Sequence, residues 1–177
     1  MSLNNLWTFL PHPRRRSCAA ATVALLLQAG APTLPAVAQT PPPAAGVGGI
    51  WIDHTGDGAV EIALCGDRLC GRIVWLKEPV DKAGRPLTDG NNPEPGKRRR
   101  AICGLPIIGD LRRMGGVWDA GWIYDPKDGK SYDLEIRTRP GDRLQVTGYI
   151  GTKFLSETFT WTRAPAGLKR CDQVAAQ

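Results

Sequence analysis

From residue 49 onward, apolar and polar positions alternate with a period of two, in short runs separated by turn residues. Such alternation is typical of half-buried β-strands. The clearest run lies in residues 59–65, where Val60, Ile62 and Leu64 alternate with small or charged residues. No long apolar pattern with the 3.6-residue period of a helix occurs in this part of the sequence. The pattern therefore predicts an all-β domain.

The runs predict about eight short antiparallel strands that are joined in chain order. Their ranges are 49–53, 59–65, 69–77, 105–111, 120–125, 130–137, 143–150 and 155–163. An up-and-down barrel is favoured over a sandwich, because closure removes the exposed edges of the sheet. We therefore predict a single antiparallel up-and-down β-barrel at residues 49–164, followed by a C-terminal tail at residues 165–177.

The segment from Asp125 to Gly129 (D-P-K-D-G) is consistent with either a hairpin turn or an acidic metal-binding loop. Proline and glycine stand where a tight turn favours them. A calcium loop needs oxygen ligands at alternating positions, and here Pro126 and Lys127 occupy such positions. We predict a turn and no metal site, and the segment from His54 to Gly58 fails as a metal loop on the same grounds.

Residues 1–38 have the features of a secretory signal peptide. Three arginines, Arg14–Arg16, precede an apolar run at 17–29 and a small-residue exit at 36–38. The apolar run of 13 residues is too short to span a bilayer, which takes about 20. A Pro/Gly/Ala linker, expected to be flexible, follows at residues 39–48. We predict an extracytoplasmic protein, periplasmic or secreted, with no transmembrane segment after cleavage.

The formal net charge of the whole chain is +6, but removal of Arg14–Arg16 lowers it to +3, with 20 basic and 17 acidic residues. This balance does not indicate a nucleic-acid binder. The densest basic run, Lys97–Arg100, lies in a long segment, 78–102, that contains four prolines and three glycines. Loops of this length in a compact domain are usually functional or mobile. An envelope component is therefore one predicted partner of this loop.

After cleavage the chain keeps four cysteines: Cys65, Cys70, Cys103 and Cys171. An even number in an oxidising compartment predicts two disulfides, for which three pairings are possible. Cys65 and Cys70 flank a predicted hairpin loop, where facing positions come close enough to bridge. This favours a Cys65–Cys70 bond and, by elimination, Cys103–Cys171. The cysteine spacings lack the paired knuckles of a zinc site.

Candidate catalytic residues are few. His54 is the one histidine left after cleavage, and it lies in a turn without a G-x-S-x-G context. Acidic residues could converge for hydrolysis, but most lie in turns or on polar strand positions. We predict no catalytic residue and no cofactor, and this balance favours a protein that is not an enzyme.

Aromatic residues are numerous on the predicted strands. Because an eight-stranded barrel can just hold one small ligand, some of them are candidates to line a cavity. The candidates are Trp75, Trp122, Tyr124, Tyr132 and Phe159. A core filled by aromatic side chains is the alternative, and strand parity does not distinguish a filled interior from a hollow one.

Short motifs along the chain together resemble an uncharacterised bacterial family, domain of unknown function 2147. They are G-I-W (49–51), L-C-G-R-I-V (69–74), N-N-P (91–93), G-L-P-I-I (104–108), G-W-I-Y-D-P (121–126), D-G-K-S-Y (128–132), G-Y-I-G (148–151) and W-T-R (161–163). The resemblance implies an exported protein with a lipocalin-like β-barrel. Lipocalins lay a basic side chain of the last strand over the tryptophan of a G-x-W motif. Gly49, Trp51 and Arg163 occupy matching places, which implies a cation–π contact that closes the barrel.

These observations favour a binder of a small apolar or amphipathic molecule in a barrel cavity. The alternative is a cell-envelope interaction module that acts through the 78–102 loop, and a hydrolase with converging acids ranks third.

Overall fold

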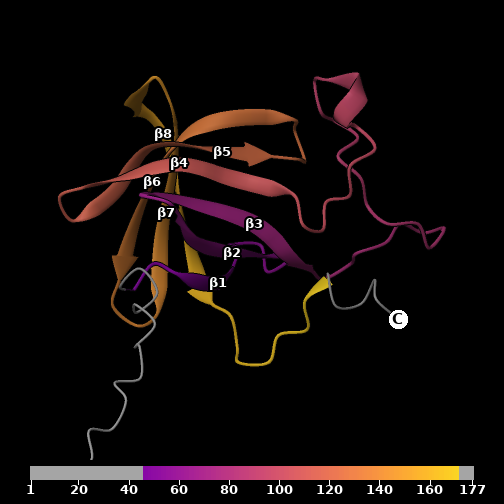
Figure 1. Ribbon diagram of the computed structural model, residues 1–177, viewed down its shortest axis with the longest axis horizontal. Coiled ribbons are helices and arrows are strands. Elements are labelled where there is room, and N and C mark those ends of the chain that lie inside the picture. The colour runs from indigo at the N-terminus through magenta and orange to yellow at the C-terminus, as the bar shows by residue number, and fades with distance from the viewer. Residues whose placement is uncertain (1–45, 172–177) are drawn as a thin grey trace, which may run out of the picture. The chain divides into compact units, whose positions relative to one another are not determined.

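The computed structural model describes residues 46–171, which form a β-barrel (Figure 1). The predicted signal peptide, most of the predicted linker and the end of the tail lie outside these residues. The eight strands are β1 (Gly49–Ile52), β2 (Gly58–Cys65), β3 (Arg68–Leu76), β4 (Pro106–Met114), β5 (Val117–Asp125), β6 (Lys130–Arg139), β7 (Arg143–Ile150) and β8 (Thr152–Arg163). Each strand pairs antiparallel with the next, and β8 pairs with β1, so the sheet is closed. The predicted up-and-down barrel is confirmed.

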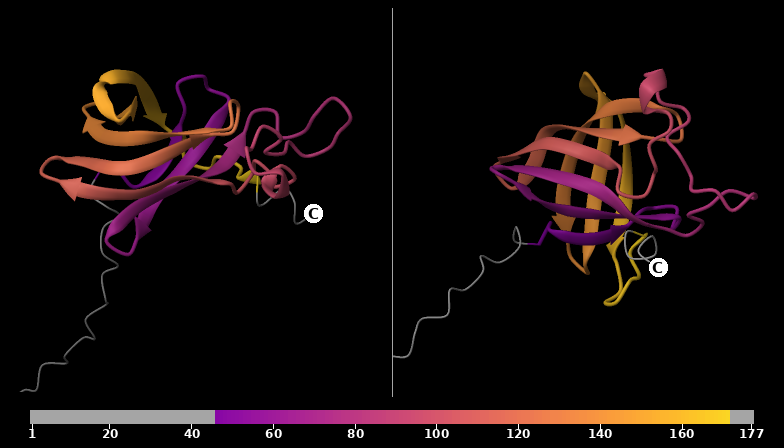
Figure 2. Two further views of the ribbon diagram at one scale, coloured as in Figure 1. Left: turned by 90° about the horizontal axis from the view of Figure 1, so that it is seen from above. Right: turned by 45° about the vertical axis from the view of Figure 1, so that its right-hand side comes forward.

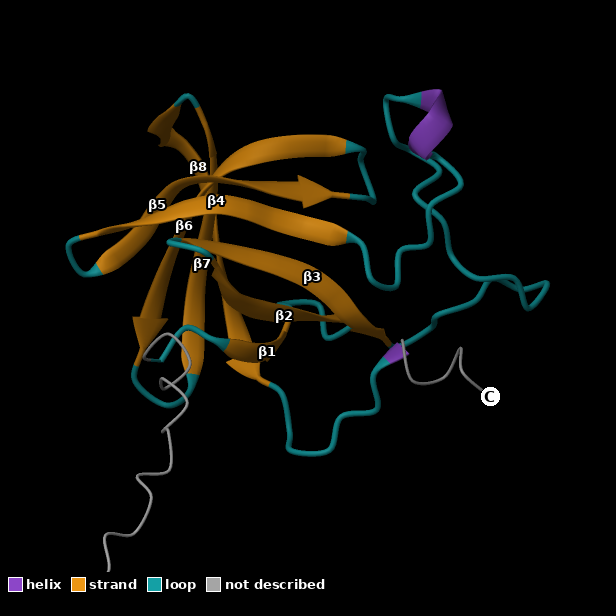
Figure 3. Ribbon diagram, in the orientation of Figure 1, coloured by secondary structure: helices purple, strands orange, loops and turns teal. Residues whose placement is uncertain are grey.

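The loops between strands are short, except for the segment between β3 and β4 (Figure 3). That segment extends from one end of the barrel and carries one 3-10 turn, η1 (Pro95–Lys97) (Figure 2). The predicted hairpin turn after Asp125 is confirmed, because Asp125 pairs with Lys130 and the Gly129 amide donates to the Asp125 carbonyl. In the part of the chain that the structure describes, no helix is long and apolar enough to cross a membrane.

Apolar side chains fill the barrel interior. Those at most 2% exposed on the inward-facing positions are Trp51, Ile62, Leu69, Ile108, Leu111, Leu134, Ile136, Leu144 and Val146. At that exposure no water-sized space touches these side chains, so the middle of the lumen is packed rather than hollow. Burial of each such side chain contributes about 1.5–3 kcal/mol to folding. The filled lumen is therefore the main hydrophobic core.

Arg163 closes one end of the barrel. Its guanidinium carbon lies 3.9 Å from the ring centroid of Trp51, and its two terminal nitrogens donate to the carbonyls of Gly46 and Gly48, each at 2.9 Å. Gly49 has a φ of +120°, and a Cβ there would lie 2.5 Å from the Arg163 guanidinium. Only glycine therefore lets the chain pass beneath this side chain.

Residues 46–48, which the sequence assigns to a flexible linker, belong to this closed end. Val47 is 1% exposed, and its carbonyl accepts a hydrogen bond of 2.8 Å from the Trp51 indole. The ordered domain thus begins a few residues before β1. Composition alone did not reveal this, because Arg163, at the other end of the domain, supplies the hydrogen bonds to Gly46 and Gly48 that hold this segment.

The seam between the first and last strands is short. β8 has 12 residues, but it pairs with β1 only through Trp51–Arg163 and Ile52–Thr162. Beyond these pairs the ring of His54 stacks on Phe159, with centroids 4.0 Å apart. The barrel is therefore closed by two residue pairs, the Arg163 contacts and a hydrogen bond of 2.9 Å from the Ala164 amide to the Ile50 carbonyl. The first part of β8 has no strand neighbour on the β1 side.

Both favoured disulfides are confirmed. Cys65 bonds to Cys70 across the β2–β3 hairpin, and Cys103 bonds to Cys171, each pair with a Cα–Cα distance of 6.0 Å. The second bond ties the C-terminal segment to the barrel. Arg170 adds a two-pronged contact with Glu61 on β2, with N–O distances of 2.6 and 2.8 Å.

Replacement of Arg163 tests its role in closure. We expect Arg163→Ala to lower the free energy of unfolding by about 2–4 kcal/mol, because it removes two charge-assisted hydrogen bonds and a cation–π contact. Urea unfolding followed by tryptophan fluorescence measures the change. Arg139→Ala, on an exposed hairpin, is the control and should change stability little. Equal effects of the two substitutions would contradict a special role for Arg163.

Candidate functional site

The structure does not bring the five predicted cavity residues together. Ile123 pairs with the buried Ile108, so its neighbours Trp122 and Tyr124 point to the outer face of the barrel. Tyr132 pairs with Ile123 and Phe159 with Val146, which places both in inward-facing rows. Trp75 pairs with Ala59 beside a β-bulge. The prediction of one lumen lined by these five residues is thus corrected, because they lie on opposite faces of the sheet and other apolar side chains fill the interior.

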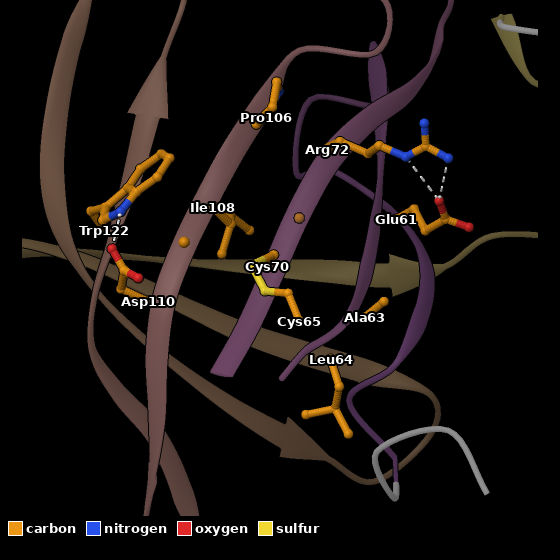
Figure 4. Close-up of a pocket in the computed structure, with 12 residues that line it drawn as sticks. Glu61, Ala63, Leu64, Cys65, Cys70, Arg72, Pro106, Ile108, Asp110 and Trp122 are labelled. Atoms are coloured by element: carbon orange, nitrogen blue, oxygen red, sulfur yellow. Dashed lines mark hydrogen bonds and ion pairs between the residues drawn. A yellow bond between two sulfur atoms is a disulfide. The ribbon is translucent and has the colours of Figure 1, made fainter. Parts of the chain in front are cut away.

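A groove lies instead on the outer wall of β2, β3, β4 and β5 (Figure 4). Its volume is about 430 Å³. The side chains that define its walls and rim are Glu61, Ala63, Leu64, the Cys65–Cys70 disulfide, Arg72 and Trp122. We call this feature the outer-wall groove. It combines an apolar floor with charged groups at the rim, as small-molecule sites commonly do.

Trp122 forms one wall of the groove by lying flat against β4. It pairs with Gly109, and a Cβ at Gly109 would lie 2.4 Å from the indole ring. Its indole nitrogen donates to the Asp110 carboxylate at 2.9 Å. Asp110 has a φ of 59°, a left-handed conformation rare for residues other than glycine. A glycine inside a strand often marks a place where another group approaches the backbone closely. Gly109 is therefore the feature of the sequence from which this wall could have been predicted.

Glu61 lies at the opposite rim between two guanidinium groups. Arg170 contacts both carboxylate oxygens, and Arg72 contacts Oε2 at 3.1 and 3.2 Å. The hydrogen bonds from Arg170 lower the pKa of Glu61 most, partial burial opposes them, and Arg72 lowers it further. The rim therefore carries an ionised carboxylate. Glu61 and Arg170 are functional candidates that the sequence did not single out, because they are 109 residues apart.

Asp89 fixes the long loop to the outer wall. Its carboxylate is fully buried and accepts hydrogen bonds from Tyr124 Oη at 2.6 Å, Asn92 Nδ2 at 2.8 Å and Arg100 Nη2 at 2.9 Å. Burial is the largest influence and raises the pKa of Asp89, but the three hydrogen bonds and the Arg100 charge together hold it below its usual value. Tyr124 is thus a structural partner of the loop, not a cavity wall.

Three of the four residues in the basic run have partners within the same loop. Lys97 pairs with Glu94, Arg98 donates to the Asn92 carbonyl at 2.7 Å, and Arg100 pairs with Asp89. Arg99 is exposed. Most of the positive charge that suggested an envelope contact therefore serves to hold the loop together.

A pair of acids does converge, on the outer face of β5 and β6. Lys153 bridges Asp119 and Glu135, and Arg137 contacts Glu135 from the other side. The pKa of Glu135 is lowered mainly by the hydrogen bond from Arg137, and that of Asp119 is lowered by Lys153, the Ala120 amide and Tyr149 despite burial. Two-carboxylate hydrolysis needs one acid that keeps its proton near neutral pH. This cluster is an ion-pair network without such an acid.

Among residues 46–171, no three acidic, histidine or cysteine side chains gather as a metal site would require.

Comparison with protein families settles the relationship that the motifs indicate. The family model described as "Uncharacterized protein conserved in bacteria (DUF2147)" matches residues 49–163. The chain belongs to this family. Its match coincides with the barrel, from the first residue of β1 to the last residue of β8. No curated protein matches the chain.

One solved structure resembles this DUF2147 protein. It is protein HP1028 from the human pathogen Helicobacter pylori, described as belonging to the lipocalin family. The two chains are 22% identical with a TM-score of 0.59, and the match covers 67% of this chain and 83% of the other. At this identity the similarity establishes the lipocalin-like fold of the DUF2147 barrel and carries no information about its ligand.

The Asp89 contacts predict a large loss of stability on truncation. We expect Asp89→Ala to lower the free energy of unfolding by about 2–4 kcal/mol, because it leaves Tyr124 and Asn92 with buried polar groups that lack a partner. Urea unfolding at neutral pH measures this loss. Glu94→Ala, in the same loop but exposed, should change stability little, and a comparable loss there would contradict the role given to Asp89.

The free energy of unfolding should also decrease when the pH is lowered. Because folding lowers the pKa of Asp89, its carboxylate contributes stability that is fully present above the unfolded-chain pKa of about 3.9 and is lost as the pH falls through the lower folded-state value. We therefore expect the free energy of unfolding to decrease below about pH 4, and Asp89→Asn to flatten that decrease. Parallel curves for the two proteins would show that Asp89 does not contribute.

Proposed function

We propose that this protein is an exported binder of a small amphipathic molecule and that the outer-wall groove holds the ligand. The observation that carries the proposal is the contrast between a filled lumen and a groove of about 430 Å³ beside a half-buried indole. Cavities of roughly 300–1,000 Å³ are typical of small-molecule sites. The two disulfides and the bacterial family support an oxidising, extracytoplasmic location.

The groove is suited to a ligand with a flat apolar part and polar ends. Trp122 offers an aromatic wall, and Ala63 and Leu64 supply apolar surface on the β2 side. Polar groups of the ligand would lie near Asp110 at one rim and near Glu61 and Arg72 at the other. Arg72 and Trp122 are carried by strands two positions apart in the sheet, about 10 Å across. A ligand of this length would span the groove.

Binding inside the barrel is the weaker candidate. Tyr132 and Phe159 face inward and are only half-buried, but apolar side chains that are at most 2% exposed occupy the middle of the lumen. A lumen ligand would need these packed side chains to move apart, which costs packing energy at each of them. The outer-wall groove needs no such rearrangement, so it is the better candidate.

An envelope contact through the 78–102 loop stays a proposal, but fewer of the loop's basic residues are available to make it. Since Arg98 and Arg100 hold the loop together, their replacement would disturb its fold as well as its charge. Arg99→Ser removes an exposed charge without breaking those contacts. Unchanged binding of this variant to envelope preparations would leave the loop without evidence for a partner.

A substitution that fills the groove tests the proposed site. Ala63 lines the groove and is exposed, so we expect Ala63→Phe to occupy part of its volume without disturbing the core. An anilinonaphthalene sulfonate dye, itself flat, apolar and charged at one end, is the probe in a fluorescence titration. Its affinity should fall about tenfold or more.

Ala83→Phe, in the exposed part of the long loop, is the matched control and should leave dye affinity unchanged. Native mass spectrometry of the purified proteins, the second measurement, should detect a co-purified small molecule with the control and less of it with Ala63→Phe. Equal dye binding by both variants would overturn the assignment of the groove.

A further inference from the structure

The Cys65–Cys70 disulfide lines the outer-wall groove and lies within reach of solvent (Figure 4). Cys65, at the end of β2, is exposed, and Cys70, on the outer face of β3, is half-buried. Both cysteines of the second bond, Cys103 and Cys171, are half-buried. A thiol in solution can therefore approach Cys65 more readily than either sulfur of the second bond.

The fold depends little on the Cys65–Cys70 bond. The strands that it joins are already paired around it, Ala63 with Cys70 and Cys65 with Arg68. The bond closes a loop with a sequence separation of 5, against 68 for Cys103–Cys171. Because closing a short loop removes less entropy from the unfolded chain, a cross-link there stabilises the fold less. Exposed disulfides are also the more easily reduced ones.

Two guanidinium groups flank Cys70 along β3. Arg68 and Arg72 stand two positions before and after it, so all three side chains point to the outer face, about 6–7 Å apart along the strand. Arg68 contacts Asp67, which is 89% exposed, and Arg72 contacts Glu61. Positive charge beside a cysteine favours its thiolate form, and a stabilised thiolate leaves faster. Cys70 is therefore the sulfur that leaves when the bond is attacked at its exposed end.

We propose that this bond is a site of thiol–disulfide exchange and that its reduction weakens binding in the outer-wall groove. First, the thiolate of a small thiol attacks Cys65 Sγ and forms a mixed disulfide. The Cys65–Cys70 bond breaks, and its electron pair leaves on Cys70 Sγ, which takes up a proton. A second thiolate then attacks the thiol-derived sulfur, and Cys65 Sγ leaves and is protonated. Two thiols thus supply the two electrons that the cysteines gain, and they end as one oxidised disulfide.

The effect of reduction on binding rests on the proposed function of the groove. Ala63 and Leu64 line the groove next to the bond. β1 pairs with β2 only as far as Ile62, so the end of β2 from Ala63 to Cys65 has β3 as its one strand neighbour. Once the bond is broken, less holds this wall in place, and a ligand would have to order it on binding.

A redox titration with glutathione tests the exchange. The purified protein is equilibrated with mixtures of reduced and oxidised glutathione, N-ethylmaleimide blocks the free thiols, and peptide mass spectrometry locates them. We expect Cys65 and Cys70 to be labelled at ratios at which Cys103 and Cys171 remain bonded. A trapped glutathione adduct should lie on Cys65. Reduction of both bonds together, earlier reduction of Cys103–Cys171, or an adduct on Cys70 would contradict the proposal.

Dye binding before and after this selective reduction tests the effect on the groove. The affinity for the anilinonaphthalene sulfonate dye should fall about fivefold or more on reduction. The double variant Cys65→Ala/Cys70→Ala should bind the dye as weakly as the reduced protein, and thiols should not change its affinity. Urea unfolding followed by tryptophan fluorescence checks that this variant is folded.

The redox proposal and the proposed function fail in different ways. If the oxidised protein binds the dye and reduction leaves the affinity unchanged, the groove remains the ligand site and the effect of reduction on binding is overturned. If the oxidised protein does not bind the dye, the proposed function fails and the effect on binding fails with it. The glutathione titration decides the exchange in either case.

Discussion

The position of one guanidinium group determines how this barrel is closed. Two antiparallel residue pairs are too few to hold the first and last strands together unaided, since isolated strand pairs are marginal in water. Arg163 adds a contact with the face of Trp51 and hydrogen bonds to two carbonyls upstream of β1. The indole is buried by the same contact, and its own N–H is satisfied by Val47. The same contacts of Arg163 and Trp51 therefore close the barrel, bury the tryptophan and order the segment before β1.

The short seam leaves most of the β1-facing edge of β8 without a strand neighbour, while the other edge pairs with β7. His54 covers only the part of this gap beside Phe159. The middle of the lumen is occupied by the hydrophobic core.

The sequence predicted the strand number, their order and the disulfide pairing because each depends on local signals. Alternation identifies a strand, and a hairpin brings nearby residues such as Cys65 and Cys70 together.

The sequence did not predict which side of each strand faces inward. Trp122 and Tyr124 are more hydrophobic than typical outward residues, but Ile123 is the one that points to the lumen. Both aromatic residues are sheltered outside the barrel, Trp122 against Gly109 and Tyr124 by Asp89, through contacts far away in sequence. The alternation of inward and outward residues is also interrupted at Asp110 and Ala120, which have positive φ angles. A pattern of hydrophobicity does not reveal such irregular backbone.

A rigid, filled barrel is a suitable support for a site on its surface. The outer-wall groove has Gly109 under its indole wall, a disulfide at one rim and a carboxylate held by two arginines at another. If a ligand binds there, none of these groups would have to be ordered, so the side-chain ordering part of the entropic cost of binding has already been met in folding. The same argument distinguishes the groove from the lumen, where any ligand would first have to separate side chains that pack against each other. Packing of the interior thus supports the proposal that a ligand binds outside the barrel, and the side chains that pack there are the same ones that make the fold stable.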